Sequence, residues 1–170
     1  VAGCFLVSFI SITIIDLQVN LIPIIGCLLA FLLLNWYPAK LFMGDSGSTF
    51  LGALFFTSAF SSCSFEKFFA FIIINLPIFG DAIICIFRRF LAGHNIFKPH
   101  KLHLYQRLYS SGWSKSKVSS LYILMTLLLA ISYYVGNFKS LITASFLILF
   151  LGWYIDGKFS LPFNFDNLKK

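Results

Sequence analysis

One carboxylate, Asp45, stands in a short polar turn between two long apolar runs of the sequence. Gly44 and Gly47 flank it, and glycines allow tight backbone geometry and close approach of a ligand. Ser48 follows as a natural cap for a helix, whose first N–H groups favour anions such as phosphate. A carboxylate beside a phosphate needs a cation between them, and Mg²⁺ takes one or two protein carboxylates together with phosphate oxygens. The turn therefore indicates either a magnesium–phosphate site at Asp45 or a plain helix cap.

A second polar segment, residues 88–117, is basic and contains all the histidines of the chain but no acidic residue. His100 and His103 are three positions apart, so one helical turn would place both on one side. A two-histidine metal site is conceivable, although no acidic third ligand lies nearby in the sequence. His94 precedes this pair and is interpreted as a polar loop residue.

Asp81 lies in the apolar run just before this basic segment. It comes about two helical turns before Arg88, so the two side chains would point to one side of a helix. An acid inside an apolar helix usually faces a partner or a watery cleft. The spacing leaves two alternatives open: a structural ion pair of Asp81 with Arg88 or Arg89, or a direct role in binding a substrate.

The remaining sequence is strongly apolar, with 59% hydrophobic and only 11% charged residues. A soluble domain carries about 25% charged residues, and its helices show polar faces, which these runs lack. A membrane-spanning helix needs roughly 20 mostly apolar residues. We therefore expect an all-α, polytopic membrane helix bundle that forms one transmembrane domain over residues 1–170. Its six expected transmembrane helices lie near 1–17, 21–37, 47–64, 68–87, 118–136 and 140–156.

The distribution of basic residues predicts which loops share a side of the membrane. Short basic loops stay cytoplasmic, so the loop 88–117 is expected there, although attraction to anionic lipid would explain its lysines equally well. Counting helices then puts the turn 38–46 on the same side. The connections at 18–20, 65–67 and 137–139 fall on the opposite side. The last two apolar runs carry no motif and are expected to be scaffold or lipid-facing.

The segment from Asn35 to Gly52 reads N-x-x-P-A-K-x-F-M-G-D-S-G-S-x-x-x-G. It closely resembles a signature of the polyprenyl-phosphate N-acetylhexosamine-1-phosphate transferases, glycosyltransferase family 4. This superfamily includes phospho-N-acetylmuramoyl-pentapeptide transferase and the transferases that start O-antigen and enterobacterial common antigen synthesis. The resemblance implies that Asp45 binds a catalytic magnesium or manganese ion, or acts as a nucleophile, and that Asn35 lies close to it.

The run Pro77-x-x-x-Asp81, with Arg88-Arg89 and the histidine segment after it, resembles the last large cytoplasmic loop of the same family. The resemblance implies that His100 and His103 contact the diphosphate of a nucleotide sugar. Here Leu104, Tyr105 and Gln106 follow His103, where many members have adjacent histidines. The pattern H-x-x-H-x-Y-Q is more similar to the branch that serves O-antigen and related surface polysaccharides. The other candidate substrate-binding residues are Lys40, Asp81, Arg88, Arg89 and Arg107.

The resemblance implies transfer of an N-acetylhexosamine-1-phosphate from a UDP-N-acetylhexosamine to polyprenyl (undecaprenyl) phosphate, with release of UMP. This step would initiate cell-envelope polysaccharide or peptidoglycan lipid-intermediate synthesis. It implies a multi-pass protein of the inner (cytoplasmic) membrane, in contact with the lipid bilayer, with active-site loops facing the cytoplasm. A homodimer is a candidate assembly, and no nucleic-acid partner is expected.

Complete family members have ten or eleven spans and an aspartate pair in an earlier cytoplasmic loop, and this sequence has no adjacent aspartates. The chain is therefore expected to be the C-terminal part of a longer transferase, inactive in isolation because half of the site is absent. Two alternatives stay open. One is a catalytically incomplete membrane fragment, and the other is a membrane transporter, which would place polar residues along the middle of its helices.

Overall fold

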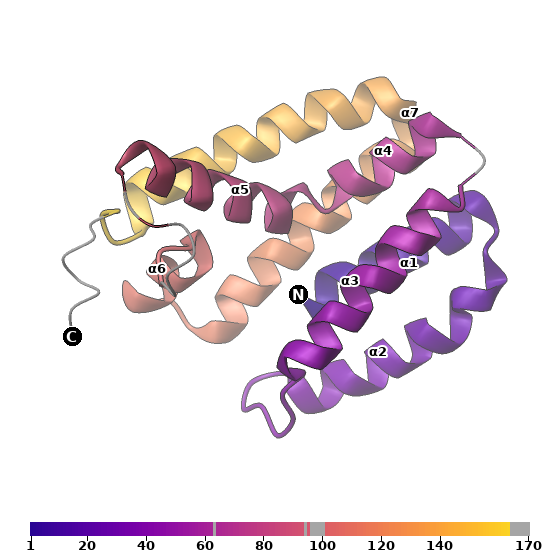
Figure 1. Ribbon diagram of the computed structural model, residues 1–170, viewed down its shortest axis with the longest axis horizontal. Coiled ribbons are helices and arrows are strands. Elements are labelled where there is room, and N and C mark those ends of the chain that lie inside the picture. Colours follow the sequence, from indigo (N-terminus) through magenta and orange to yellow (C-terminus); the bar gives the residue numbers. More distant parts are fainter. Residues whose placement is uncertain (63, 94, 96–100, 164–170) are drawn as a thin grey trace.

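Every regular element in the described part of the chain is a helix (Figure 1). The computed structural model describes all residues of 1–170 except 63, 94, 96–100 and 164–170. The expected all-α fold is confirmed. The elements are α1 (Ala2–Asp16), η1 (Val19–Leu21), α2 (Ile22–Asn35), α3 (Gly44–Phe60), α4 (Phe65–Ile74), α5 (Leu76–Leu91), α6 (Leu104–Ser110) and α7 (Lys115–Phe159).

The first three long helices and the last one follow the apolar runs of the sequence. α1, α2 and α3 match the expected helices to within a few residues. α7 covers both of the last two runs, and its backbone leaves the helical conformation at Asn137, with φ 66° and ψ −171°. Asparagine is enriched among the non-glycine residues that adopt positive φ. The chain reverses there, and the second half of α7 runs back toward the end where α7 began (Figure 1).

The expected single helix over 68–87 is wrong, because the chain breaks between α4 and α5 and bends by 73°. Pro77 lies in the first turn of α5, where its missing N–H and its fixed φ do not disturb the new helix but prevent α4 from continuing. Asn75 occupies the break with a fully buried side chain. Its Nδ2 donates to the Phe71 carbonyl (3.2 Å), and its Oδ1 accepts from the Ser8 hydroxyl (2.9 Å).

The six expected membrane spans remain a prediction. By length and composition, one helix, α7, is long and apolar enough to cross a membrane, and α4 with α5 would make a second if the bent pair is one span. Large apolar side chains are widely exposed, including Leu33 on α2 and Val135 on α7. Exposed apolar surface of this extent marks contact with a membrane or with further protein.

α1 lies at the centre of the packing and contacts α2, α3, α4 and α7. The largest fully buried side chains come from several helices and include Phe9, Phe55, Phe71, Leu129 and Leu141. The rings of Phe5 and Phe55 meet edge to face at a centroid distance of 5.5 Å. If lipid surrounds the bundle, such close packing, rather than the exclusion of water, holds the helices together.

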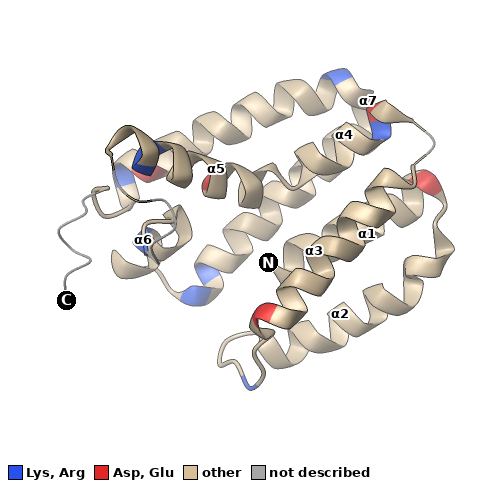
Figure 2. Cartoon of the chain, in the orientation of Figure 1, with Lys and Arg blue, Asp and Glu red and all other residues tan. Residues whose placement is uncertain are grey.

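The polar segments that connect the helices lie at two opposite ends of the molecule. The α2–α3 connection, α6 and the start of α7 lie toward one end, and the α1–α2 and α3–α4 connections lie toward the other with the bend of α7 (Figure 1). Charged residues lie mostly toward these two ends of the chain's helices, and few lie in between (Figure 2). At the second end the Asp16 carboxylate pairs with Lys67 at 2.7 Å. The two motif-bearing loops thus share one end, as the loop count predicts.

Replacing Asn75 with alanine tests the bend. Asn75→Ala removes two hydrogen bonds at a position that water does not reach, so we expect the free energy of unfolding to fall by about 1–3 kcal/mol. The matched control is Asn20→Ala, which changes an exposed asparagine in η1, with an expected effect within about 0.5 kcal/mol. Denaturant unfolding of the detergent-solubilised protein measures both, and equal losses would contradict a structural role for the buried amide.

Candidate active site

A cleft of about 710 Å³ opens at the end of the molecule that carries the motifs. Its walls come from the start of α1, the end of α2, α5, α6 and the start of α7. Three of the sequence-predicted site residues, Asn35, Asp81 and His103, line it together. The fold thus brings the first motif and the histidine segment to one cavity, although 68 positions separate Asn35 from His103 in the sequence.

Asp81 is the most connected of these residues. Its Oδ1 accepts from the backbone N–H of Leu104 (2.8 Å), at the first position of α6, and its Oδ2 accepts from the Tyr122 hydroxyl (3.0 Å) of α7. The Nδ1 of His103 lies 3.9 Å from Asp81 Oδ1. Only 9% of the Asp81 side chain is exposed, so these donors replace most of its hydration.

His103 and Tyr105 form the wall of the cleft next to Asp81. Their rings stack at a centroid distance of 5.5 Å with 17° between the planes. Burial and the nearby negative charge of Asp81 raise the pKa of the Tyr105 phenol above its usual value. Tyr105 therefore stays a neutral hydroxyl at physiological pH. This wall offers an imidazole and a phenol to a ligand in the cleft.

Asn35 fixes the turn that leads to Asp45. Its Nδ2 donates to the Leu41 carbonyl at 2.7 Å, and the backbone N–H groups of Lys40 and Leu41 both bond to the Leu34 carbonyl (2.8 and 3.2 Å). These bonds close the turn onto the last residues of α2. Lys40 itself is exposed and does not line the cleft.

Asp45 lies in the first turn of α3 and is exposed. Gly44 before it has φ +65°, a conformation that favours glycine. A Cβ added at Gly47 would lie 2.6 Å from Met43 Cγ, so the turn is also closely packed. The carboxylate does not line the cleft that holds Asn35, Asp81 and His103.

A metal site is therefore not formed by the described residues alone, among which no group of three His, Cys, Asp or Glu side chains comes together. Magnesium needs only one or two protein carboxylates when phosphate oxygens and water complete its shell. The exposed carboxylate of Asp45 fits that limited requirement. The role of Asp45 as a metal ligand stays a prediction.

The arginines of the second motif are held by a carboxylate that the motif does not contain. Arg88 Nη1 lies 2.6 Å from Asp156 Oδ2, and Arg107 Nη2 pairs with the other oxygen of Asp156. Arg107 also donates to the Leu161 carbonyl (2.8 Å). The ring of Phe163 lies 5.3 Å from the Arg88 guanidinium and 5.2 Å from that of Arg107.

Of the two alternatives for Asp81, the ion pair with Arg88 or Arg89 is not formed in the described part of the chain. Asp81 bonds to Tyr122 and to the start of α6 instead, while Arg88 turns to Asp156. The buried Arg89 donates to the Asn95 carbonyl and so holds the chain after α5. His100 and His94, with Lys98, lie outside the described residues.

A second cavity, of about 310 Å³, lies between α5 and the two halves of α7. Its walls are mostly apolar, with Pro77, Ile84 and Ile148 among them, and Arg88, Arg107 and Asp156 stand at its polar part. Asp81 and Tyr122 line both this cavity and the larger cleft. The two cavities thus meet at one hydrogen-bonded pair.

Comparison with known proteins identifies the first part of this arrangement. Residues 1–63, which contain the Asn35–Gly52 signature, match the sequence profile of "Glycosyl transferase family 4". No solved structure matches the chain.

The relatives that match the chain are named as transferases of phosphorylated N-acetyl sugars. The chain is 40% identical to a probable undecaprenyl-phosphate N-acetylglucosaminyl 1-phosphate transferase of Bacillus subtilis over 54% of the chain and 26% of the relative. It is 30% identical to a phospho-N-acetylmuramoyl-pentapeptide-transferase of Kosmotoga olearia over 78% of the chain and 42% of the relative. It is also 32% identical to a decaprenyl-phosphate N-acetylglucosaminephosphotransferase of Mycobacterium tuberculosis, over 55% of the chain and 27% of the relative. The chain thus matches less than half the length of each of these relatives.

Two polar residues that line the cavities were not among the predicted site residues. Tyr122 and Asp156 lie in the last two apolar runs, which were expected to be scaffold or lipid-facing, yet both line the cavities. Asp156 could have been recognised from the sequence, because it is a lone acid at the end of an apolar run. That end lies on the same side as the arginine-rich loop. Tyr122 carries no such signal, since a tyrosine in an apolar run is usually a packing residue.

Removing the Asp156 carboxylate tests the arginine cluster. Asp156→Ala leaves Arg107, whose side chain is only 7% exposed, without its anionic partner. We expect the free energy of unfolding to fall by about 3 kcal/mol, and Asp156→Asn, which keeps two polar atoms, to lose less. The matched control, Glu66→Ala, removes an exposed carboxylate. If both alanine variants unfold at the same denaturant concentration, the cluster has no structural role.

Proposed function

We propose that the complete protein transfers an N-acetylhexosamine-1-phosphate from a UDP-sugar to polyprenyl phosphate at the cytoplasmic face of the inner membrane. A phosphate oxygen of the lipid attacks the β-phosphorus of the UDP-sugar. A new P–O bond forms, the P–O bond to UMP breaks, and UMP leaves. The observation that carries the proposal is the cleft in which the family 4 motif and the histidine segment converge. The names of the relatives support the same reaction.

The larger cleft suits the nucleotide sugar. Its volume of about 710 Å³ lies within the range of roughly 300–1,000 Å³ that is usual for small-molecule sites. His103 is placed to donate a hydrogen bond to the diphosphate, and Lys115 in the same wall adds positive charge.

The smaller cavity suits the lipid acceptor. Apolar side chains from α5 and α7 line most of it, and two arginines stand at one part. A polyprenyl phosphate has the same division into a long apolar chain and an anionic head. Because the two cavities share Asp81 and Tyr122, an acceptor phosphate in one would approach a sugar diphosphate in the other at this pair.

Magnesium enters the proposal through Asp45, whose carboxylate would hold the ion while the bonds of Asn35 keep the turn closed. When bound, such an ion neutralises phosphate oxygens on which charge builds up during transfer. Asp45, in the first turn of α3, follows the turn whose residues Pro38, Ala39 and Phe42 line the cleft.

The arrangement favours a transferase over a transporter. Charges collect at the ends of the helices (Figure 2), whereas a transporter requires polar groups along its path through the membrane. The incomplete-fragment alternative is tested by co-expression. The chain alone and the chain with the segment that supplies the remaining length of the relatives are compared for UMP release. UMP release that requires both the chain and the added segment supports the proposal. If the two expressed together release no UMP, the proposal is contradicted.

Changing His103 tests the diphosphate contact. In the active complete protein, His103→Ala should raise KM for the UDP-sugar about tenfold with a smaller change in kcat, because one hydrogen bond to a charged group is lost. Lys139→Ala, an exposed lysine beside the bend of α7, is the control and should leave KM unchanged. Steady-state UMP release measures both, and an unaltered KM in His103→Ala would count against this contact.

Changing Asp45 tests the metal ligand. Asp45→Asn keeps the size of the side chain but removes its charge. No side chain makes a capping bond at the start of α3, so the fold should tolerate the change. A metal ligand would not, and we expect kcat to fall about 10²-fold while the magnesium concentration for half-maximal activity rises. Wild-type turnover in this variant would sink the metal role. UMP release over a magnesium titration gives both quantities.

A further inference from the structure

Two lysines near the two ends of α7 stand on a continuous row of aromatic rings. The Lys117 ammonium lies 3.8 Å from the centre of the Trp113 ring. Trp113 packs against Phe159 at a centroid distance of 5.7 Å. Lys158 lies 5.6 Å from the Phe159 ring centre and donates to the Tyr154 hydroxyl at 3.0 Å. Trp113, Lys117, Tyr154, Lys158 and Phe159 are called the aromatic–lysine surface below.

The positive charge of this surface is not neutralised by the described residues. Lys117 and Lys158 are both exposed, and neither forms an ion pair there. The nearest acid along the chain, Asp156, is turned to Arg88 and Arg107. At the opposite end of the molecule, by contrast, Lys67 is paired with Asp16.

The pairing of lysines with rings is unusually dense. Energetically significant cation–π contacts occur about once per 70–80 residues. Here Lys117 and Lys158 both lie over rings, and Lys115 next to them lies 5.5 Å from the ring centre of Tyr109. Tryptophan and tyrosine prefer the boundary between hydrocarbon and water, where one edge of the ring is apolar and the other is hydrated. The combination indicates a partner that is apolar and anionic at once.

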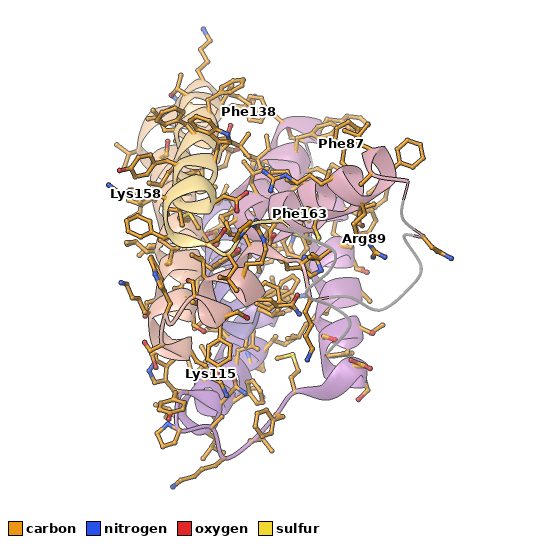
Figure 3. The ribbon with its side chains drawn as sticks, turned by 90° about the vertical axis from the view of Figure 1, so that its left-hand side faces the viewer. Phe87, Arg89, Lys115, Phe138, Lys158 and Phe163 are labelled. Atoms are coloured by element: carbon orange, nitrogen blue, oxygen red, sulfur yellow. The ribbon has the colours of Figure 1, made fainter. Side chains whose placement is uncertain are left out.

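The surface lies along one edge of the motif-bearing end. Figure 3 looks onto this end and shows Lys115 and Lys158 along one edge, Arg89 toward the opposite edge, and Phe163 between them. In the proposed membrane setting this end meets the cytoplasmic leaflet, whose anionic lipids attract basic segments.

We propose that the aromatic–lysine surface binds the headgroups of anionic phospholipids. The two ammonium groups contact lipid phosphates, and the Trp113 and Tyr154 rings lie at the level of the headgroups. An acidic protein segment would match the charge but not the exposed rings of Tyr154 and Phe159, so lipid is the better occupant. The inference rests on the proposed membrane setting and orientation but not on the transfer reaction.

Competition between two lipids tests this. The complete protein is purified in a micelle that contains equal amounts of phosphatidylglycerol and phosphatidylcholine, without nucleotide sugar, and the retained lipids are quantified by mass spectrometry. The wild type should enrich phosphatidylglycerol, and the double variant K117Q/K158Q should lower that ratio about tenfold. K117R/K158R keeps both charges and should keep the ratio.

A lysine elsewhere provides the second control. Lys139→Gln removes an exposed charge beside the bend of α7 and should retain the wild-type lipid ratio. An unchanged ratio in K117Q/K158Q, including the case in which the surface serves only an acidic protein, overturns the proposal. An equal loss in Lys139→Gln also overturns it, because any positive charge would then suffice. UMP release is not read in this experiment, so a failed transferase assay leaves its outcome intact.

Discussion

The buried carboxylate of Asp81 is the constraint on which the motif-bearing end depends. An ion taken out of water costs several kcal/mol unless donors replace its hydration. Here the donors come from two other elements, the N–H that opens α6 and the hydroxyl of Tyr122 on α7. Satisfying one charge therefore ties α5 to both elements and fixes where His103, the residue before α6, can lie. His103 is therefore positioned by the hydrogen bond from the backbone N–H of the next residue, Leu104, to Asp81.

Asp156 plays the matching part at the C-terminal end of α5, where it pairs with Arg88. Its two oxygens take one guanidinium from α5 and one from α6, so the end of α7 is drawn onto both helices. Two arginines with one carboxylate keep a net positive charge, which attracts a phosphate while the arginines themselves stay fixed. The Phe163 ring against both guanidiniums adds cation–π attraction without reducing that charge.

The sequence allows the helices to be predicted where a single physical signal decides them. The apolar runs give α1, α2, α3 and both halves of α7, because a charge or a polar turn ends each one. The helix break before Leu76 is not predicted by the sequence analysis, which uses Pro77 only as part of a motif. A proline within an apolar run also predicts a helix boundary. The partners of the charges could not be predicted in the same way. Arg88 and Asp156 are 68 positions apart, and spacing along one helix says nothing about a contact that a chain reversal at Asn137 creates.

The candidate site is only partly assembled in the structure: three of its predicted residues line one cleft, and Asp45 does not. Asn35 and His103 meet in the cleft because short bonds hold each to its own element. Asp45, by contrast, is held by the backbone of α3, and its carboxylate contacts no other charged group of the described residues. A carboxylate without a cation partner at an exposed helix start is suited to a ligand that brings its own positive charge. In the proposed reaction a metal ion with a nucleotide diphosphate is such a ligand, and Lys115 in the wall of the cleft would offer a cation to its phosphates.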